Sequence, residues 1–159
     1  MFVQKKYLTK EQALQKLRQY CAYQERSHYE AEQKLWDLGI SSDLHSEMIA
    51  LLIEEDYINE ERFAIAFAGG KFRMKQWGRK KILYALKEKQ VSPYCIKKAM
   101  KQISQDDYEA VLNQLARRKY ALLKSDQYLV RKKKTIDYLL QKGFESELAV
   151  KAVNQLQKK

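Results

Sequence analysis

The sequence predicts an all-α protein built from three tandem three-helix repeats, which form an elongated, curved array. The first observation is the scarcity of turn formers: the chain holds 5 glycines and 1 proline, fewer than sheets joined by tight turns usually need. The second is a hydrophobic content of 45%, which allows a real core and argues against wholesale disorder. The third is an apolar pattern of helical spacing that returns twice along the chain.

The repeat becomes visible when the sequence is displaced by 51 residues and then by a further 53. After an Ile, Val or Phe position, the apolar members recur at every fourth residue, as one face of a helix demands. A three-helix unit of about fifty residues buries little surface, so neighbouring units are expected to stack and to offer a long surface rather than a deep pocket. The matching positions are Leu35, Gly39, Ile40, Ser41, Leu44, Met48 and Leu52; Leu86, Gln90, Val91, Ser92, Cys95, Ala99 and Ile103; and Leu139, Gly143, Phe144, Glu145, Leu148, Ala152 and Leu156.

In the first unit, assigned to residues 1–57, the predicted helices span 9–25, 27–39 and 41–56. Thr9 and Gln12 have the spacing of a capping box that opens the first helix. Gly39 suits the left-handed residue that closes the second helix, and Ser41 suits the N-cap of the third.

In the second unit, assigned to residues 58–104, the predicted helices span 59–75, 78–90 and 92–103. Asn59 is expected to cap the first of them, and Phe63 and Phe67, four residues apart, are expected to face inward. Ser92 suits an N-cap, followed by Pro93 at the first helical position, where a missing N–H costs nothing.

In the third unit, assigned to residues 105–159, the predicted helices span 106–124, 126–142 and 145–157. Gly143 is expected to close the middle helix in a left-handed conformation, as Gly39 does in the first unit.

Charge is distributed unevenly along the chain. Residues 1 to 60 hold 7 Lys/Arg against 11 Asp/Glu, whereas residues 61 to 159 hold 24 against 9, within a total net charge of +11. An acidic front and a strongly basic rear indicate a polyanionic partner for the rear. The alternative is a basic surface that has no specific partner and serves solubility.

The stretch KFRMKQWGRKKI, residues 71 to 82, interleaves six cations with two aromatic rings. Lys71, Arg73 and Lys75 end one predicted helix, where the dipole favours positive charge. Arg79, Lys80 and Lys81 open the next helix, at the end where the dipole disfavours it. Helix stability therefore explains the first three cations but not the second three.

On the helix predicted at 78–90, a projection at ~100° per residue separates three groups of side chains. Ile82, Leu83 and Leu86 form the buried stripe, Lys80, Tyr84 and Lys87 share the adjoining stripe, and Lys81 lies on the side away from the core. Before the helix, Trp77 is interpreted as a packing residue rather than a base-stacking platform, and Gly78 as the site of a sharp turn.

The third unit carries cations at corresponding places. Arg131 to Lys134 occupy the positions of Gly78 to Lys81, with Lys133 and Lys134 expected to face water, and Arg117 and Arg118 begin a further cluster. Two basic runs in successive stacked units predict a continuous band that contacts nucleic acid, directly or through a nucleoprotein. The candidate binding residues are Arg79, Lys80, Lys81, Tyr84, Lys87, Arg117, Arg118, Lys133 and Lys134.

No pattern of active-site residues is found, so an enzyme, a cofactor and a metal site are not expected. His28 and His45 lack ligands at metal spacing and are interpreted as surface residues, while Cys21 and Cys95 are interpreted as buried, reduced thiols. The sequence shows neither a charged-then-apolar leader nor an apolar run near 18 residues. We therefore expect a cytoplasmic protein that does not cross a membrane.

Three segments of the sequence resemble the signature of the RecX family, bacterial regulators of the RecA recombinase. These are INEERFA at 58 to 64, WGRKKILYAL at 77 to 86 and VSPYCIKKAM at 91 to 100. Phe63, Trp77 and Gly78 are the structural signature residues within them. The resemblance runs from about residue 9 to residue 157, and it differs in the third unit, where Val130 and Arg131 replace the Trp-Gly pair.

The resemblance implies tandem three-helix repeats and a negative regulator of RecA, acting in homologous recombination, DNA repair and the SOS response. Family members bind RecA filaments on single-stranded DNA, lie along the filament groove, and suppress ATP hydrolysis and strand exchange. The implied partners are thus the RecA filament and single-stranded DNA, with duplex DNA as a further candidate, and the protein is expected to be a monomer. Many members carry a longer N-terminal extension, and functions tied to it are not expected here.

Two other functions remain open at this stage. A stand-alone DNA-binding protein of helix-turn-helix type would bind duplex DNA tightly without RecA. A purely protein-binding scaffold would bind RecA even when its basic clusters are neutralised.

Overall fold

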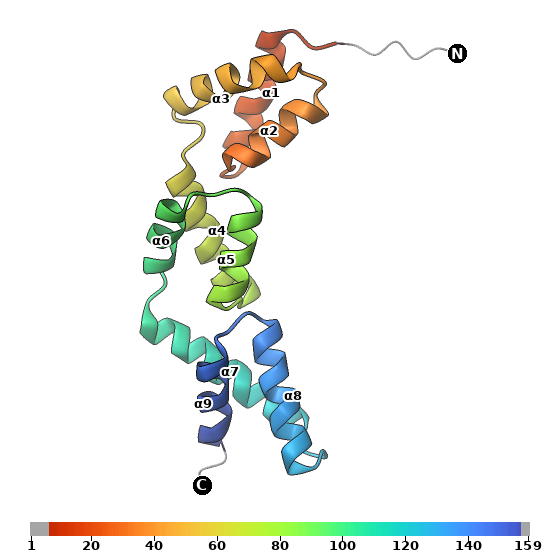
Figure 1. Cartoon of the computed structure of the whole chain (residues 1–159), viewed down its shortest axis with the longest axis vertical. Helices are drawn as coiled ribbons and strands as arrows, with labels where there is room; N and C mark the ends of the chain where they lie inside the picture. The colour runs from red at the N-terminus through yellow and green to blue at the C-terminus, as the bar shows by residue number, and fades with distance from the viewer. Residues whose placement is uncertain (1–6, 157–159) are drawn as a thin grey trace, which may run out of the picture.

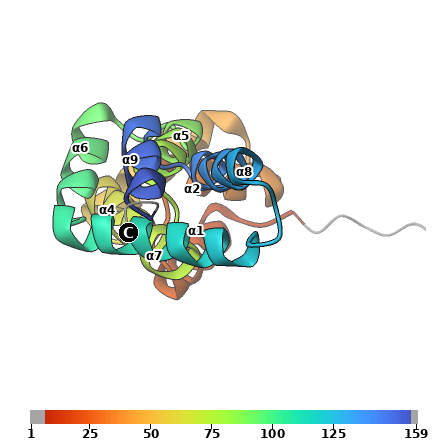
Figure 2. The same cartoon turned by 90° about the horizontal axis from the view of Figure 1, so that it is seen from below.

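The computed structural model describes residues 7–156, which form three helical units stacked along one long axis (Figure 1). The expected elongated array of three-helix repeats is confirmed, and within residues 7–156 there is no β-strand. The first unit holds α1 (Lys10–Tyr23), α2 (His28–Asp37), the short 3₁₀ turn η1 (Ser42–Leu44) and α3 (His45–Glu54); the second holds α4 (Glu60–Lys75), α5 (Arg79–Glu88) and α6 (Pro93–Lys101); the third holds α7 (Gln105–Leu122), α8 (Tyr128–Gln141) and α9 (Ser146–Leu156). Viewed along the axis, the units lie over one another (Figure 2).

Most of the helices begin close to the residues predicted from the sequence, and several of them begin at a predicted N-cap. The capping box of Thr9 and Gln12 opens α1, and Asn59 and Ser92 cap α4 and α6 through their side chains. A second capping box, in which Ser27 and the Glu30 carboxylate each accept from the other's backbone N–H, opens α2. Each box satisfies two N–H groups that have no partner within the helix.

The turn that follows the second helix of each unit contains one residue in the left-handed backbone conformation. Gly39 and Gly143 adopt positive φ of 74° and 98°, as predicted, and Gln90 occupies the equivalent place at 59°. At all three places the next residue, an Ile, Val or Phe, returns its N–H to a carbonyl of the preceding helix. The repeat is therefore a repeat of backbone geometry, and the second unit maintains it without a glycine.

The prediction that Ser41 caps a helix over residues 41–56 is wrong. Ser41 Oγ bonds the Asp43 carboxylate instead, residues 42–44 form a 3₁₀ turn, and the α-helix begins at His45. The His45 ring places Nε2 2.8 Å from the Ile40 carbonyl oxygen, which ties the turn to the end of the preceding segment. The domain limits at residues 57 and 104 stay a prediction.

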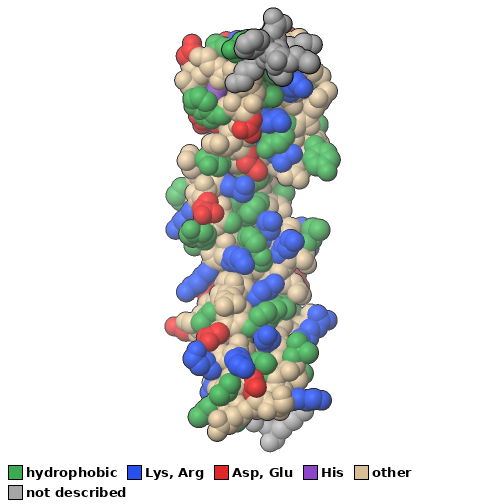
Figure 3. Space-filling model, turned by 90° about the vertical axis from the view of Figure 1, so that its right-hand side faces the viewer, with side chains coloured by type: hydrophobic (Ala, Val, Ile, Leu, Met, Phe, Trp, Pro, Cys, Tyr) green, Lys and Arg blue, Asp and Glu red, His purple; other side chains and the backbone are tan. Residues whose placement is uncertain are grey.

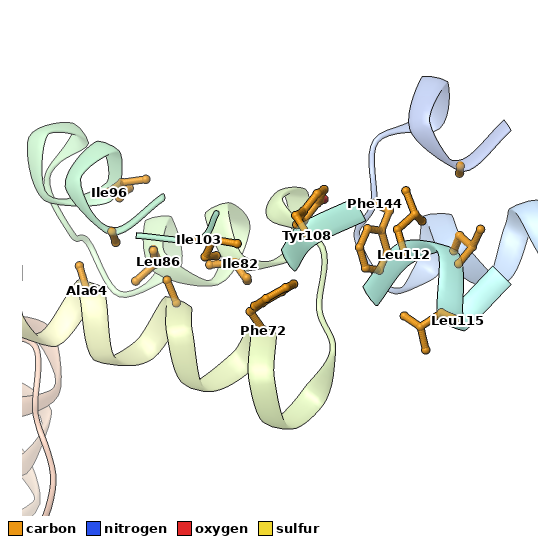
Figure 4. Close-up of a cluster of buried hydrophobic side chains, with 14 of the residues drawn as sticks. Ala64, Phe72, Ile82, Leu86, Ile96, Ile103, Tyr108, Leu112, Leu115 and Phe144 are labelled. Carbon is orange, nitrogen blue, oxygen red and sulfur yellow. The ribbon is translucent and has the colours of Figure 1, made fainter. Parts of the chain in front are cut away.

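The second and third units share one hydrophobic core (Figure 4). Phe63 is buried and contacts Phe67, which packs against this core, so both rings face inward as predicted. Tyr108 at the start of α7 is fully buried between Phe72 of the second unit and Phe144 of the third, with ring centroids 5.9 and 5.2 Å away. A continuous core of this kind makes the two units one mechanical body.

Two glycines bring the backbones of these units together. Gly78 N–H donates to the Lys142 carbonyl at 2.7 Å, and Lys80 N–H donates to the Gly143 carbonyl at 2.9 Å. A Cβ on Gly78 would lie 2.3 Å from the carbonyl carbon of Gly143. Gly78 has an ordinary φ of −77°, so it is needed for close approach to the third unit rather than for the sharp turn that the sequence suggested.

The first unit has a core of its own, separate from the shared one. Its largest buried side chains are Leu17, Leu35, Met48, Leu52 and Ile58. The contact with the second unit is polar instead: Arg62 of α4 reaches Glu25 at 2.6 Å, and Lys89 reaches Glu30 at 3.3 Å. Both cysteines are free and buried, Cys21 in this core and Cys95 in the shared one. None of the helices in the described part of the chain combines the length and apolar character that a membrane crossing requires.

Candidate nucleic-acid interface

The exposed stripe of α5 carries two lysines and a tyrosine. Lys80, Tyr84 and Lys87 are exposed, Tyr84 to 65%, while Ile82 and Leu86 are fully buried beneath them. This is the division of faces that the sequence predicts. The Tyr84 hydroxyl donates to the Glu88 carboxylate, and this bond raises the pKa of Tyr84.

Arg79 joins two units and is not a free surface cation. Its guanidinium lies 3.7 Å from the centroid of the Tyr108 ring, and it bonds Glu145 at 2.9 Å and Gln105 at 2.7 Å. Its backbone N–H donates to the Tyr108 hydroxyl, which in turn donates to Glu145. These contacts explain a cation at a helix start, and a role for Arg79 in binding stays a prediction.

Lys81 also differs from its predicted position on the side away from the core. The side chain is half-buried, and Nζ lies 4.7 Å from the centroid of the Trp77 ring. Its stem passes over Gly143, where any added Cβ would lie 2.4 Å from the Lys81 Cβ. Trp77 is itself half-buried and packs against the shared core, as predicted, with Lys71 Nζ 5.0 Å from its ring centroid.

The basic run of the third unit lies one turn inside its helix. Because α8 begins at Tyr128, Arg131 is not at a helix start, unlike Gly78, with which the repeat aligns it. Arg131 donates to the Tyr120 carbonyl and covers the Tyr120 ring at 3.5 Å, which fixes α8 on α7. Lys133 and Lys134 are exposed, as predicted, and pair with Asp137 and Asp126.

Arg117 and Arg118 lie exposed on α7. Neither forms an ion pair with any residue between 7 and 156. Two solvated guanidinium groups without carboxylate partners are free to meet an external anion.

Cations extend along the length of one face of the molecule. Figure 3 shows Lys and Arg side chains distributed from the first unit to the last, with fewer acidic side chains among them. This is the side that α5 and α8 present on the right of Figure 1. Cations spread along a long, narrow body suit a charged polymer better than a small ligand.

The candidate site contains no cluster with the chemistry of an active site. Among residues 7–156, no three His, Cys, Asp or Glu side chains converge as metal ligands. His45, expected at the surface, is 2% exposed; it packs edge-on against Trp36 and points Nδ1 toward Glu32 at 3.8 Å. The sequence signal for burial was present in the repeat, since Leu44 and Met48 flank His45 on the apolar pattern.

Sequence reasoning missed three cations near Trp77. Lys71 and Lys75 were explained by the helix dipole alone, and Lys142 was not singled out, yet its Nζ donates to the Lys75 carbonyl at 2.6 Å. No local motif indicates this proximity, because Lys142 reaches α4 only through the packing of the third unit on the second.

Comparison with known proteins places this architecture. Models of the second and third three-helix domains of RecX match residues 59–100 and 97–153. The chain is 31% identical over 134 residues to the regulatory protein RecX of Clostridium perfringens (strain 13 / Type A), covering 82% of this chain and 62% of that protein. It is 30% identical over 145 residues to the one from Lactobacillus johnsonii, covering 91% of this chain and 53% of that protein. The chain thus spans between half and two-thirds of the length of these relatives.

Solved structures agree with the sequence comparison. The crystal structure of RecX from Lactobacillus salivarius superposes with a TM-score of 0.82 at 25% identity, covering 92% of this chain and 96% of that one. A second crystal structure of a regulatory protein RecX, at 17% identity, has the same fold with a TM-score of 0.81, covering 97% of this chain and 81% of that one. Since domain models, relatives and structures agree, this chain belongs to the RecX family of regulatory proteins.

Proposed function

We propose that this protein is a negative regulator of the RecA recombinase. It binds RecA filaments on single-stranded DNA, lies along their helical groove, and inhibits ATP hydrolysis and strand exchange. Membership of a family of regulatory proteins supports the regulatory role. The observation that carries the mode of binding is the spread of cations along one face of an elongated body.

The proposed contacts use the exposed cations of the second and third units. They meet the phosphate backbone of the DNA or acidic side chains of RecA, while the acidic first unit contacts a different RecA protomer. The residues assigned to the basic contact are the exposed cations Lys80, Lys87, Arg117, Arg118, Lys133 and Lys134, together with the half-buried Lys81 and the exposed ring of Tyr84. The protein acts as a monomer in the cytoplasm and contributes no catalysis of its own.

Inhibition then follows from bridging. ATP turnover and strand exchange require RecA protomers to change their relative geometry, and a ligand that binds one geometry better shifts the population toward it. A body whose second and third units share one core resists bending between its contacts, so it opposes such changes. Many exposed cations acting together make the binding sensitive to salt.

The test is a RecA ATPase assay on single-stranded DNA, titrated with this protein over a series of salt concentrations. We expect loss of hydrolysis well below one copy per RecA protomer, and weaker inhibition as salt rises. The variant Lys133→Ala/Lys134→Ala should inhibit less and with a shallower salt dependence, because two exposed cations are removed at little cost in stability.

The matched control is Lys97→Ala/Lys101→Ala, which removes the same charge from the exposed face of α6, on the opposite side of the molecule (Figure 1). It should inhibit as the unmodified protein does. Inhibition that is unchanged by salt and by Lys133→Ala/Lys134→Ala would contradict the basic contact and favour a scaffold that binds RecA through other surfaces. Tight binding to duplex DNA without RecA would favour the helix-turn-helix alternative.

A further inference from the structure

Four lysines converge around Trp77 where the second unit meets the third. Lys71 and Lys75 come from the end of α4, Lys81 from the first turn of α5, and Lys142 from the end of α8. Nζ of Lys71 and Nζ of Lys81 lie 5.0 and 4.7 Å from the Trp77 ring centroid. Nζ of Lys142 bonds the Lys75 carbonyl at 2.6 Å. These five residues are called the Trp77 cluster below.

The Trp77 cluster has no internal counter-charge. Within residues 7–156, none of its lysines forms an ion pair with a carboxylate. Lys142 is half-buried, and its burial together with the charges of Lys81 and Lys75 lowers the pKa of Lys142. The fold thus holds like charges near one another although their repulsion opposes it.

Other cations at the junctions between units, unlike the lysines of the Trp77 cluster, are paired with carboxylates. Arg62, Arg79 and Lys89, which also join units, each have a carboxylate partner, at 2.6, 2.9 and 3.3 Å. The helix dipole explains Lys71 and Lys75 at the end of α4, but it disfavours Lys81 at the start of α5. An uncompensated cluster among compensated ones indicates that its counter-charge comes from a bound anion.

We propose that the Trp77 cluster binds the phosphodiester backbone of a single-stranded nucleic acid. This proposal rests on the proposed function in one respect, which is that the single strand is taken to be the DNA within a RecA filament. Lysines suit phosphate as mobile point charges, and the four of the cluster are not engaged by a described carboxylate, unlike Lys89, Lys133 and Lys134. An aromatic ring beside the cations is the usual companion of single-strand binding.

The fluorescence of Trp77 can report on binding to the cluster. In a Trp36→Phe background, Trp77 is the only tryptophan of the chain, because Trp36 is the other of the 2. A single-stranded oligothymidylate, titrated in without RecA, should change the Trp77 emission saturably, and the apparent affinity should fall as salt rises. Unchanged Trp77 emission at low salt would overturn the proposal.

The variant Lys75→Gln/Lys142→Gln, in the same background, tests the lysines. Glutamine at position 142 retains an N–H donor for the Lys75 carbonyl, and an unchanged melting temperature checks the fold. We expect the affinity for the oligothymidylate to fall about tenfold. The slope of log affinity against log salt should become shallower by about 1.4, for two lost phosphate contacts on a single strand.

The matched control is Lys97→Gln/Lys101→Gln, which lowers the net charge equally on α6. Equal losses in both variants would show a general charge effect and overturn the site. A Trp77 response to polyglutamate as strong as that to the oligothymidylate would assign the cluster to an acidic protein segment instead, which also overturns the proposal.

The RecA ATPase assay separates this site from the proposed function. If Lys75→Gln/Lys142→Gln loses the oligothymidylate but inhibits RecA fully, the site is supported and inhibition does not depend on it. If it binds the oligothymidylate normally, the site is wrong, whatever the outcome with RecA.

Discussion

Gly78 and Gly143 set the distance between the second and third units. Their backbones are joined by the bonds from Gly78 to Lys142 and from Lys80 to Gly143, which leave no room for a side chain. The sequence indicated Gly143 correctly, because a helix end is a local event with a local glycine signal. It indicated Gly78 for the wrong reason, since the approach of another unit leaves no local pattern.

We expect Gly78→Ala to lower the free energy of unfolding by about 2–3 kcal/mol, because the new methyl group overlaps backbone atoms of Gly143 that cannot move aside cheaply. Urea unfolding measures the change. Gly70→Ala is the control: a Cβ there meets nothing within 4 Å, and alanine in a helix should stabilise by about 0.5–1 kcal/mol. Equal effects at both positions would contradict the close contact.

Tyr108 concentrates the polar contacts of the same junction. Its hydroxyl donates to Glu145 and accepts from the Arg79 N–H, within a fully buried setting. Burial, followed by the bond to Glu145, raises the pKa of Tyr108 well above its ordinary value of 10.0. The folded state therefore keeps the proton at alkaline pH, when the unfolded state has lost it.

The sign of the pH effect follows from this difference. Stability from Tyr108 is fully present below about pH 10 and is lost as pH rises beyond it, because the folded state then binds more protons than the unfolded one. Tyr108→Phe should cost about 1–3 kcal/mol at neutral pH, since it leaves the Arg79 N–H and the Glu145 carboxylate, both half-buried, without this partner. Urea unfolding from about pH 8 to about pH 11 should show a shallower alkaline decline in the variant; parallel declines would contradict the assignment.

Arg79 and His45 mark the limit of prediction at the level of single residues. A cation at a helix start and a histidine without ligand spacing both suggested exposure. Both are engaged by residues that the chain brings from elsewhere: Glu145 meets Arg79, and the Ile40 carbonyl meets His45. Residue types alone do not reveal such partners.

Helix ends were the most predictable elements. Thr9, Asn59, Ser92 and the glycines after the second helices act on backbone groups only a few residues away, so their effect is legible in sequence. Ser41 has the same side chain, but its hydroxyl bonds Asp43 and the backbone forms a 3₁₀ turn first. A cap is predictable only when no nearer acceptor competes for the hydroxyl.

The first turn of α5 carries positive charge at the helix end where the dipole makes it unfavourable. It contains no acidic residue and has no side-chain N-cap. Lys80→Glu should raise the free energy of unfolding by about 0.5 kcal/mol, because the dipole favours an acid there. The same variant should inhibit the RecA ATPase less than the unmodified protein.

Thermal unfolding and the ATPase titration measure the two effects separately. Lys97→Glu, in the last two turns of α6, is the control, and it should lower stability slightly while leaving inhibition unchanged. If Lys80→Glu reduced both stability and inhibition, the loss of function would be a folding effect and not a lost contact.

The buried apolar side chains of residues 7–156 form two separate cores. The periodic apolar pattern predicted three equivalent units, and each three-helix unit is present. It did not predict that the second and third would merge through Tyr108, Phe72 and Phe144 while the first stayed separate. That difference depends on the residues at each junction, which are aromatic between the second and third units and charged between the first and second. The repeated apolar pattern does not show which of these residues meet between units.

The two cysteines report on the two cores. Burial raises the pKa of Cys21 to about 11, so its folded thiol is a poor nucleophile near neutral pH. In rising urea, pulse labelling with a thiol reagent and peptide mass analysis should find Cys21 exposed before Cys95, because Cys21 lies in the separate core of the first unit and two ion pairs join that unit to the second. Added salt should widen the gap by weakening Arg62–Glu25 and Lys89–Glu30. Coincident midpoints would show that the chain unfolds as one.

The polar junction between the first two units has a mechanical consequence. When the chain is pulled from both ends, we expect the first and second units to separate first, because the Arg62–Glu25 and Lys89–Glu30 ion pairs join them and their apolar cores are separate. The second and third units, which share one core, should stay together under the same load. The protein therefore combines a deformable junction between its first and second units with a stiffer body formed by the second and third units.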